Sequence, residues 1–205
     1  MIKFKNINLI LDNKEIFKDF NLSIELGEKV AIKGHSGKGK TTLFNLILGF
    51  IKPDSGEIII DELAVNKHNI SQIRKIVALL PQNPGIIGRG KIKEQILLPF
   101  QFAVNKHLLP SDEILNDELN KLNLDFSILD KSYDEISGGE KQRIGIMLAK
   151  LLQRKIMLLD EPTSALDKEN LNAVIAYLCE QKDTTIVSAS HDENWLKHCK
   201  KIIEL

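Results

Sequence analysis

The sequence predicts an α/β fold with a mostly parallel central sheet. Short apolar runs alternate along the chain with stretches of helical periodicity, which is typical of strands connected by helices. Polar residues follow closely after three of these runs: Gln82, Asp160 and His191. The 205 residues, of which 43% are hydrophobic, are enough for one domain with its own core.

Residues 1–30 predict an antiparallel β region. Residues 7–11 and 22–26 are short strand candidates, and a Gly27-Glu28 turn leads into a compact apolar strand over residues 28–33. A glycine-rich loop follows, and then a helix whose apolar face carries three residues: Leu43, Leu46 and Ile47. Further buried strands of the core sheet are expected over residues 76–80, 156–159 and 184–189.

Residues 91–135 predict a helical lobe inserted between two core strands. They lack β-rich runs and carry polar, helix-friendly stretches with Pro99 and Pro110. A further amphipathic helix is expected after Asp167, which is a plausible N-cap. Its apolar face has the i, i+3, i+4, i+7 spacing of Leu171, Val174, Ile175 and Leu178.

Composition excludes several classes of protein. Lys plus Arg and Asp plus Glu both number 28, so the net charge is zero and a basic nucleic-acid binder is not indicated. The longest apolar runs, such as residues 144–149, fall far short of the about 20 residues that a spanning helix needs. The N-terminus lacks the pattern of a secretion signal. Only Cys179 and Cys199 occur, which excludes a disulfide framework and predicts a cytoplasmic protein.

Residues 34–42 read GHSGKGKTT and fit the phosphate-loop pattern G-x-x-x-x-G-K-[ST] without a mismatch. Glycines allow a tight loop whose N–H groups point at phosphates, and the next helix adds its positive N-terminus. Lys40 is expected to reach the β- and γ-phosphates, and the Thr41 hydroxyl to bind Mg²⁺. The alternative, a chance glycine turn, is disfavoured by the flanking strand and helix. The candidate residues are Gly34, His35, Ser36, Gly37, Lys38, Gly39, Lys40, Thr41 and Thr42.

Two carboxylates, Asp160 and Glu161, end the apolar run IMLL. In a parallel sheet this end of the strand opens on the ligand crevice. Asp160 can hold Mg²⁺ through water, and Glu161 can polarise an attacking water. Such pairs are common where a strand meets a loop, so the phosphate loop upstream is what favours the catalytic interpretation.

A second candidate anion site lies at Ser137-Gly138-Gly139, at the start of a helix with Ile144, Met147, Leu148 and Leu151 on one face. The alternative is an ordinary N-cap on a core helix. One chain binds one γ-phosphate with its own loop, so a second phosphate-binding element suggests work on another molecule's nucleotide.

Five motifs in order resemble those of ATP-binding cassette (ABC) ATPases. They are GHSGKGKTT, Gln82 in LLPQNP, the signature ISGGE, the acidic strand end in IMLLDEPTSALD, and SASHD with His191. The resemblance spans residues 34–192 and extends over essentially the whole chain. It implies one ABC-type P-loop domain over residues 1–205, with the signature in a helical lobe over residues 91–150.

The resemblance implies roles for particular residues. Gln82 would contact Mg²⁺ and the lytic water and sense a membrane partner. His191 would hydrogen-bond the γ-phosphate and, with Glu161, hold the catalytic geometry. Residues 164–167 resemble the D-loop, which crosses the interface of a dimer. The signature would bind the γ-phosphate held by the opposite protomer through Ser137, Gly138, Gly139 and Glu140.

The chain departs from the family pattern at the nucleotide base. The family usually places an aromatic residue before the phosphate loop to stack on adenine, and Leu11 occupies that position. Phe4 and Phe17 are near in sequence but out of register.

The resemblance implies a Mg-ATP-hydrolysing subunit that powers a separate permease as a head-to-tail dimer, on the cytoplasmic face of the membrane. Residues 84–95 would face the permease, with Ile86 and Ile87 in the contact, although core packing explains these two isoleucines equally well. The stretch from Pro81 onward is similar to iron-exporter (Fet-type) subunits, which suggests a metal as substrate.

A regulatory ABC ATPase of the cell-division type is an alternative. A small P-loop kinase is disfavoured, because a kinase has no reason to carry ISGGE and SASHD.

Overall fold

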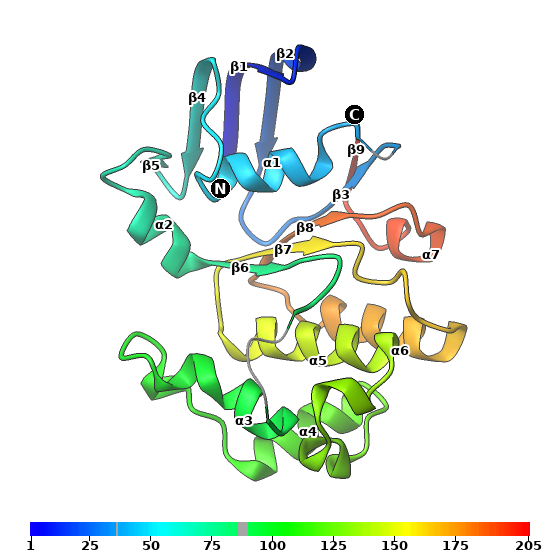
Figure 1. The fold of residues 1–205 in the computed structure, drawn as a ribbon. Helices are drawn as coiled ribbons and strands as arrows, with labels where there is room; N and C mark the ends of the chain where they lie inside the picture. Colours follow the sequence, from blue (N-terminus) through cyan, green and yellow to red (C-terminus); the bar gives the residue numbers. More distant parts are fainter. Residues whose placement is uncertain (36, 86–89) are drawn as a thin grey trace. The chain divides into compact units, whose positions relative to one another are not determined.

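A computed structural model describes residues 1–35, 37–85 and 90–205 (Figure 1). The chain divides into two compact units. The first comprises Met1–Leu79, Arg154–Asp160 and Lys182–Leu205, and the second comprises Leu80–Gln153 and Glu161–Gln181. The first unit contains both sheets and the second is helical, which confirms the predicted α/β class.

An antiparallel sheet of order β2-β1-β4-β5 forms one layer of the first unit. Its strands are β1 (Ile2–Leu11), β2 (Lys14–Ile24), β4 (Ser55–Ile60) and β5 (Leu63–Ala64). Asp12 and Asn13, both with positive φ, join β1 to β2, as expected of a tight hairpin turn. The predicted β region is therefore confirmed, and its strands are longer than the apolar runs that indicated them.

A parallel sheet of order β6-β7-β8-β3-β9 forms the other layer. Its strands are β3 (Lys29–Lys33), β6 (Val77–Leu80), β7 (Ile156–Asp160), β8 (Thr185–Ala189) and β9 (Lys201–Glu204). Every residue of β7 and β8 is buried, which explains why these strands are mostly apolar in sequence. The predicted strands are confirmed, except that Ile76 ends the short helix α2 (Ile70–Ile76) rather than starting β6.

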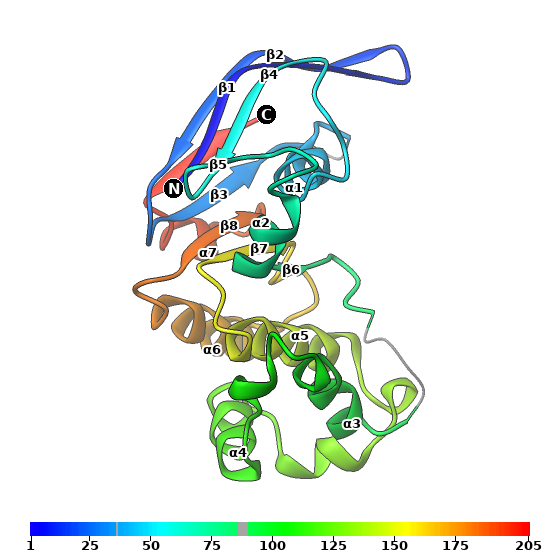
Figure 2. The same ribbon diagram turned by 90° about the vertical axis from the view of Figure 1, so that its left-hand side faces the viewer.

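Helix α1 (Lys40–Ile47) packs into the same hydrophobic core as both sheets. It buries Leu43, Phe44, Leu46 and Ile47, which confirms the predicted apolar face. In both views α1 lies between the antiparallel and the parallel sheet (Figures 1 and 2). The small helix α7 (Glu193–Leu196) completes this unit.

The second unit consists of helices (Figure 2). The α-helices are α3 (Ile92–Leu97), α4 (Asp112–Lys121), α5 (Gly138–Leu151) and α6 (Lys168–Cys179). Short 3-10 turns connect them: η1 (Leu98–Gln101), η2 (Lys106–Leu108), η3 (Phe126–Asp130) and η4 (Tyr133–Glu135). The unit is larger than the lobe expected over residues 91–150, because it begins at Leu80 and includes α6.

Helix α5 differs from its prediction. The sequence indicates one apolar face, but all residues from Gln142 to Met147 are buried, so the helix is enclosed on several sides. Asp167 caps α6 as predicted, accepting a hydrogen bond from the Asn170 N–H. Within the described ranges, none of the helices combines the length and the apolar character needed to cross a bilayer.

Candidate functional site

The phosphate loop takes its shape from glycines and from its contact with β2. Gly37 and Gly39 have φ angles of 81° and 97°, which favour glycine. A Cβ atom on Gly39 would lie 2.8 Å from Ile16 Cγ2 and 3.2 Å from Phe17 Cζ, so a side chain there has no room. The loop therefore passes directly against β2 before α1 begins at Lys40.

Lys40 lies against the loop that precedes it. Its Nζ donates to the carbonyl oxygens of Gly34 at 2.5 Å and His35 at 3.5 Å. Helix α1 begins directly after this loop, and a helix N-terminus favours bound anions. Ser36 lies outside the described residues. The predicted loop residues that are described thus form a compact cationic cradle suited to phosphates.

Thr41 and Asp160 come together although 119 residues separate them. The Thr41 hydroxyl donates to Asp160 Oδ2 at 3.1 Å. Asp160 is only 8% exposed, and this burial raises the pKa of its carboxyl group, while the Thr41 hydrogen bond and the Lys40 charge act in the opposite direction. A hydroxyl and a carboxylate are hard oxygen ligands of the kind that Mg²⁺ prefers, so this pair fits the ion.

His191 follows the strand next to Asp160. Asp160 is paired with Ala189 of β8, and Ser190 and His191 continue from that strand end. The side chain of His191 is exposed, whereas Ser190 is buried. Asp192 then caps α7, and the buried Trp195 donates to Ser188 Oγ at 2.6 Å. These contacts hold the turn that presents His191 at the carboxyl edge of the sheet.

The signature forms a capping box at the start of α5. The Ser137 hydroxyl accepts from the Glu140 N–H at 3.2 Å, and the Glu140 carboxylate accepts from the Ser137 N–H at 2.7 Å. Burial works to raise the pKa of Glu140, but these hydrogen bonds prevail and lower it. The N–H groups of Gly138 and Gly139 belong to the helix's first turn, where an anion can bind.

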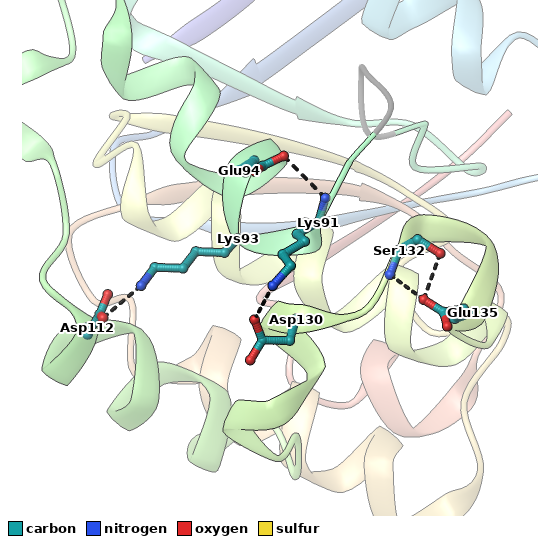
Figure 3. A network of polar contacts seen from close by, with 7 residues as sticks. All are labelled: Lys91, Lys93, Glu94, Asp112, Asp130, Ser132 and Glu135. Atoms are coloured by element: carbon teal, nitrogen blue, oxygen red, sulfur yellow. Dashed lines mark hydrogen bonds and ion pairs between the residues drawn. The ribbon is translucent and has the colours of Figure 1, made fainter.

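A polar network holds the segment that leads into the signature (Figure 3). Lys91 forms an isolated bridge with Ser132 and an ion pair of 2.8 Å with Asp130. The Glu135 carboxylate accepts from Ser132, which begins the turn before Ile136. The full set drawn is Lys91, Lys93, Glu94, Asp112, Asp130, Ser132 and Glu135. Exposed ion pairs contribute little energy, so the backbone bridge is the firmer link.

The signature and residues 165–167 line one open hollow of 550 Å³. A Cβ on Gly139 would lie 2.8 Å from the Ala165 carbonyl oxygen, so only glycine allows this approach. The sequence did not indicate that the two motifs touch within one chain. The lining residues are Ser137, Gly138, Gly139, Glu140, Arg143, Ala165, Leu166, Asp167 and Asn170.

Glu161 and Gln82 lie in the second unit. Glu161 is 8% exposed and has a φ of 50°, and its carbonyl oxygen accepts from Gln142 Nε2 at 3.2 Å. Ser164 Oγ donates to the same carbonyl oxygen at 3.1 Å. Gln82 is exposed two residues beyond β6.

Leu11 ends β1 and packs, half-buried, against the core of the first unit. Ile16 and Phe17 approach the phosphate loop at Gly39, which the sequence did not indicate. Sequence reasoning also missed Arg143 and Asn170, which line the signature hollow. Arg143 was missed because an arginine in a helix is usually exposed, and the sequence does not show that this one is buried. The pairing of the β1–β2 hairpin could have indicated that Ile16 lies near the phosphate loop.

A phosphate loop followed by a helix, next to a buried Asp that ends a parallel strand, defines a P-loop nucleoside triphosphatase. Comparison with known proteins narrows this class. The model of the ABC transporter family matches residues 17–164.

Relatives support the same assignment. The energy-coupling factor transporter ATP-binding protein EcfA1 of Oenococcus oeni is 33% identical over 100% of this chain and 76% of its own length. The probable iron export ATP-binding protein FetA of Escherichia coli is 31% identical over 100% of this chain and 91% of its own. A dimeric structure of the cassette MJ0796 bound to ADP and Pi superimposes with a TM-score of 0.83 at 28% identity, covering 100% and 94% of the two chains. The chain therefore belongs to the ABC transporter family and is an ABC-type ATPase.

Proposed function

We propose that this ATPase is the nucleotide-binding subunit of a transporter, and that it powers a separate permease as a head-to-tail dimer on the cytoplasmic face of the membrane. One observation carries the proposal. The chain has two candidate phosphate-binding elements, the loop ending at Lys40 in the first unit and the helix start at Ser137 in the second. Two copies arranged head to tail place each loop opposite the partner's signature. The dimeric structure of the similar cassette MJ0796 with ADP and Pi supports a dimer as the assembly.

The residues have distinct tasks in the proposed reaction. Lys40 binds the β- and γ-phosphates, while Thr41 and Asp160 hold Mg²⁺, which would neutralise phosphate charge. Glu161 polarises the attacking water as general base. Two further residues, His191 and Gln82, hold the γ-phosphate and the water in position. The partner's signature then completes the site with N–H and hydroxyl donors.

The permease contact is proposed for residues 84–95 and the helical unit around them. Ile86 and Ile87, which the sequence suggested for this contact, lie outside the described residues. Iron or another metal is the proposed substrate, since FetA is named for probable iron export. EcfA1 is named for an energy-coupling factor transporter rather than for iron export, so the named relatives do not agree on one substrate. Identifying the membrane protein that co-purifies with this subunit would test the substrate class.

The assembly is tested with Glu161→Gln. This change keeps the shape of the side chain and removes its basicity, so ATP still binds while hydrolysis stops. We expect size-exclusion chromatography to show a dimer when Mg-ATP is added and a monomer when it is absent. A Glu161→Gln protein that binds ATP and stays monomeric contradicts the proposal.

A further inference from the structure

Arg143 lies buried on α5, one helical turn beyond the signature glycines, and the roles assigned above do not involve it. It is 7% exposed. Its Nη1 atom donates to the carbonyl oxygens of Leu122 at 2.8 Å and Asn123 at 2.9 Å, and Nε donates to Gly139 O at 3.3 Å. These carbonyl groups belong to the two residues that follow α4, so the guanidinium connects the chain at the end of α4 to the signature turn.

The same guanidinium reaches toward residues 164–167. Arg143 Nη1 lies 2.6 Å from Asn170 Oδ1. Asn170 in turn donates to both carboxylate oxygens of Asp167, from its backbone N–H at 2.9 Å and from Nδ2 at 2.8 Å. Asp167 is the last residue of the D-loop-like segment. One side chain therefore connects the signature to this segment through a single intermediate, Asn170.

Two other contacts hold the same two motifs together. Gly139 approaches the Ala165 carbonyl oxygen too closely for any side chain. Gln142, next to Arg143, donates to the Glu161 carbonyl oxygen, which also accepts from Ser164. The signature and residues 161–167 are thus fixed to each other along their length, and their shared hollow opens between them.

We infer that Arg143, acting through Asn170, is a positioning residue that holds the signature and residues 164–167 in the arrangement that receives the partner's nucleotide. The inference rests on the proposed head-to-tail dimer. The guanidinium donates from two nitrogen atoms, Nε and Nη1, held in one plane, and a lysine ammonium has all its donors on one atom and cannot reproduce this geometry. Loss of the link leaves buried carbonyl oxygens without donors and frees the two motifs to move apart.

The inference separates two properties of the protein. ATP binding to the chain's own phosphate loop relies mainly on first-unit residues such as Lys40, Thr41 and Asp160, so it should not depend on Arg143. Dimer closure and turnover require the signature hollow of the second unit. Loss of the link therefore lowers kcat and weakens the dimer, and leaves the affinity of the monomer for ATP unchanged.

The experiment compares three variants in the Glu161→Gln background: Asn170→Ala, Arg143→Lys and Lys150→Met. Lys150 is the matched control. It is a half-buried cation of the same helix that pairs with Glu118 of α4 at 2.7 Å and lies over the Tyr177 ring of α6 at 4.2 Å. It therefore links the same three helices at the end of α5 away from the signature.

We expect Asn170→Ala and Arg143→Lys to raise the dissociation constant of the Mg-ATP dimer by about tenfold or more. Titration of the monomer with a fluorescent ATP analogue should give the parent affinity, and kcat should fall in the same variants carrying Glu161. Lys150→Met should lower the unfolding temperature and leave the dimer as tight as in the parent.

Two results overturn the inference. One is a parent-like dimer and kcat in Asn170→Ala and Arg143→Lys, and the other is an equal loss in Lys150→Met, which would mean general loosening of the helices. If the parent Glu161→Gln protein itself binds ATP without dimerising, the proposed function fails together with the inference. If only the comparison among variants fails, the proposed function stands.

Discussion

Asp160 carries a buried carboxylate that solvent stabilises poorly. It ends β7, whose five residues are all buried, and burial raises the pKa of its carboxyl group above the ordinary value of 3.8. The Thr41 hydrogen bond and the Lys40 charge offset this effect only in part. The position thus lowers the stability of the protein without its ligands, and it suits a group that binds a cation.

The pH dependence of Asp160→Asn follows from this shift. A raised pKa means that the folded protein holds the proton to higher pH than the unfolded chain does, so stability falls as pH rises from 3.8 through the folded pKa. The asparagine does not titrate. Without nucleotide and Mg²⁺, Asp160→Asn should therefore unfold at a higher temperature than wild type at neutral pH, with the difference shrinking toward pH 3.8.

Although Asp160→Asn should raise the unfolding temperature, it should lower the rate of ATP hydrolysis. Removing one preorganised electrostatic contact lowers kcat by about 10²–10³-fold. Thermal unfolding across a pH series and ATP turnover are the two measurements. An unfolding temperature below wild type at neutral pH would show that the carboxylate is stabilised rather than strained.

Leu11 predicts poor selection of the nucleotide base. An aliphatic side chain covers a purine by burial but lacks the stacking that is worth about 1–3 kcal/mol on an aromatic residue. Wild type should therefore bind ATP and GTP with similar affinity, and Leu11→Tyr should tighten ATP binding. Titration with ATP, GTP and inorganic triphosphate tests this.

Ile16→Tyr is the matched variant for that titration. Ile16 lies beside the phosphate loop at Gly39, so it is a second aliphatic residue close to the proposed nucleotide site. If only Ile16→Tyr tightens ATP binding, the adenine contact is at Ile16 rather than at Leu11. Strong ATP selectivity in wild type, with no gain from either tyrosine, would mean that a different side chain holds the adenine.

At the scale of elements, burial decides what the sequence could predict. Strands β7 and β8 are buried on both faces and are mostly apolar in sequence, so their positions were predictable. By contrast β9, with three of its four residues exposed, carries no comparable signal. Helix α7 has only four residues, too few to show helical periodicity.

The parts of the candidate site that depend on neighbouring residues were predictable from the sequence, and the contacts between distant segments were not. Local motifs indicated the phosphate loop, Asp160 and the Ser137 cap, because each depends on neighbouring residues. The approach of Gly139 to Ala165 and the link from Arg143 to Asn170 join segments distant in sequence. Such contacts depend on how helices pack, which composition and spacing do not contain.

Ser137 has two separable roles at the start of α5: it caps the helix, and it is proposed to contact phosphate. Ser111 caps α4 in the same way, accepting from the Ile114 N–H at 3.3 Å. Loss of either hydroxyl should lower the free energy of unfolding by about 1 kcal/mol. Only Ser137→Ala should also reduce ATP turnover, by about tenfold or more, since a hydrogen bond to a charged group contributes about 1.5–3 kcal/mol.

Denaturant unfolding and ATP turnover of the two alanine variants measure these effects. Equal turnover in Ser137→Ala and Ser111→Ala would assign Ser137 to capping alone. A loss of turnover in both would show that helix stability in this unit, rather than contact with phosphate, limits the reaction.

At the scale of the whole molecule, the phosphate loop and the signature belong to different compact units of one chain. Each unit carries one half of the proposed nucleotide site. In a two-fold symmetric dimer every site then takes its loop from one copy and its signature from the other. In the proposed dimer, a single copy contributes to both sites without completing either.

This arrangement predicts complementation between two variants that each have impaired turnover. Lys40→Ala damages the loop and leaves the signature intact, whereas Ser137→Ala does the reverse. In a mixed dimer one site contains both changes, and the other contains neither. An equal mixture forms mixed dimers in about half of the pairs, so turnover should return to roughly a quarter of the wild-type value. Each variant mixed with buffer alone is the control for residual activity. If the loop and the signature of the same chain formed the site, every site would carry one change, and mixing would restore nothing.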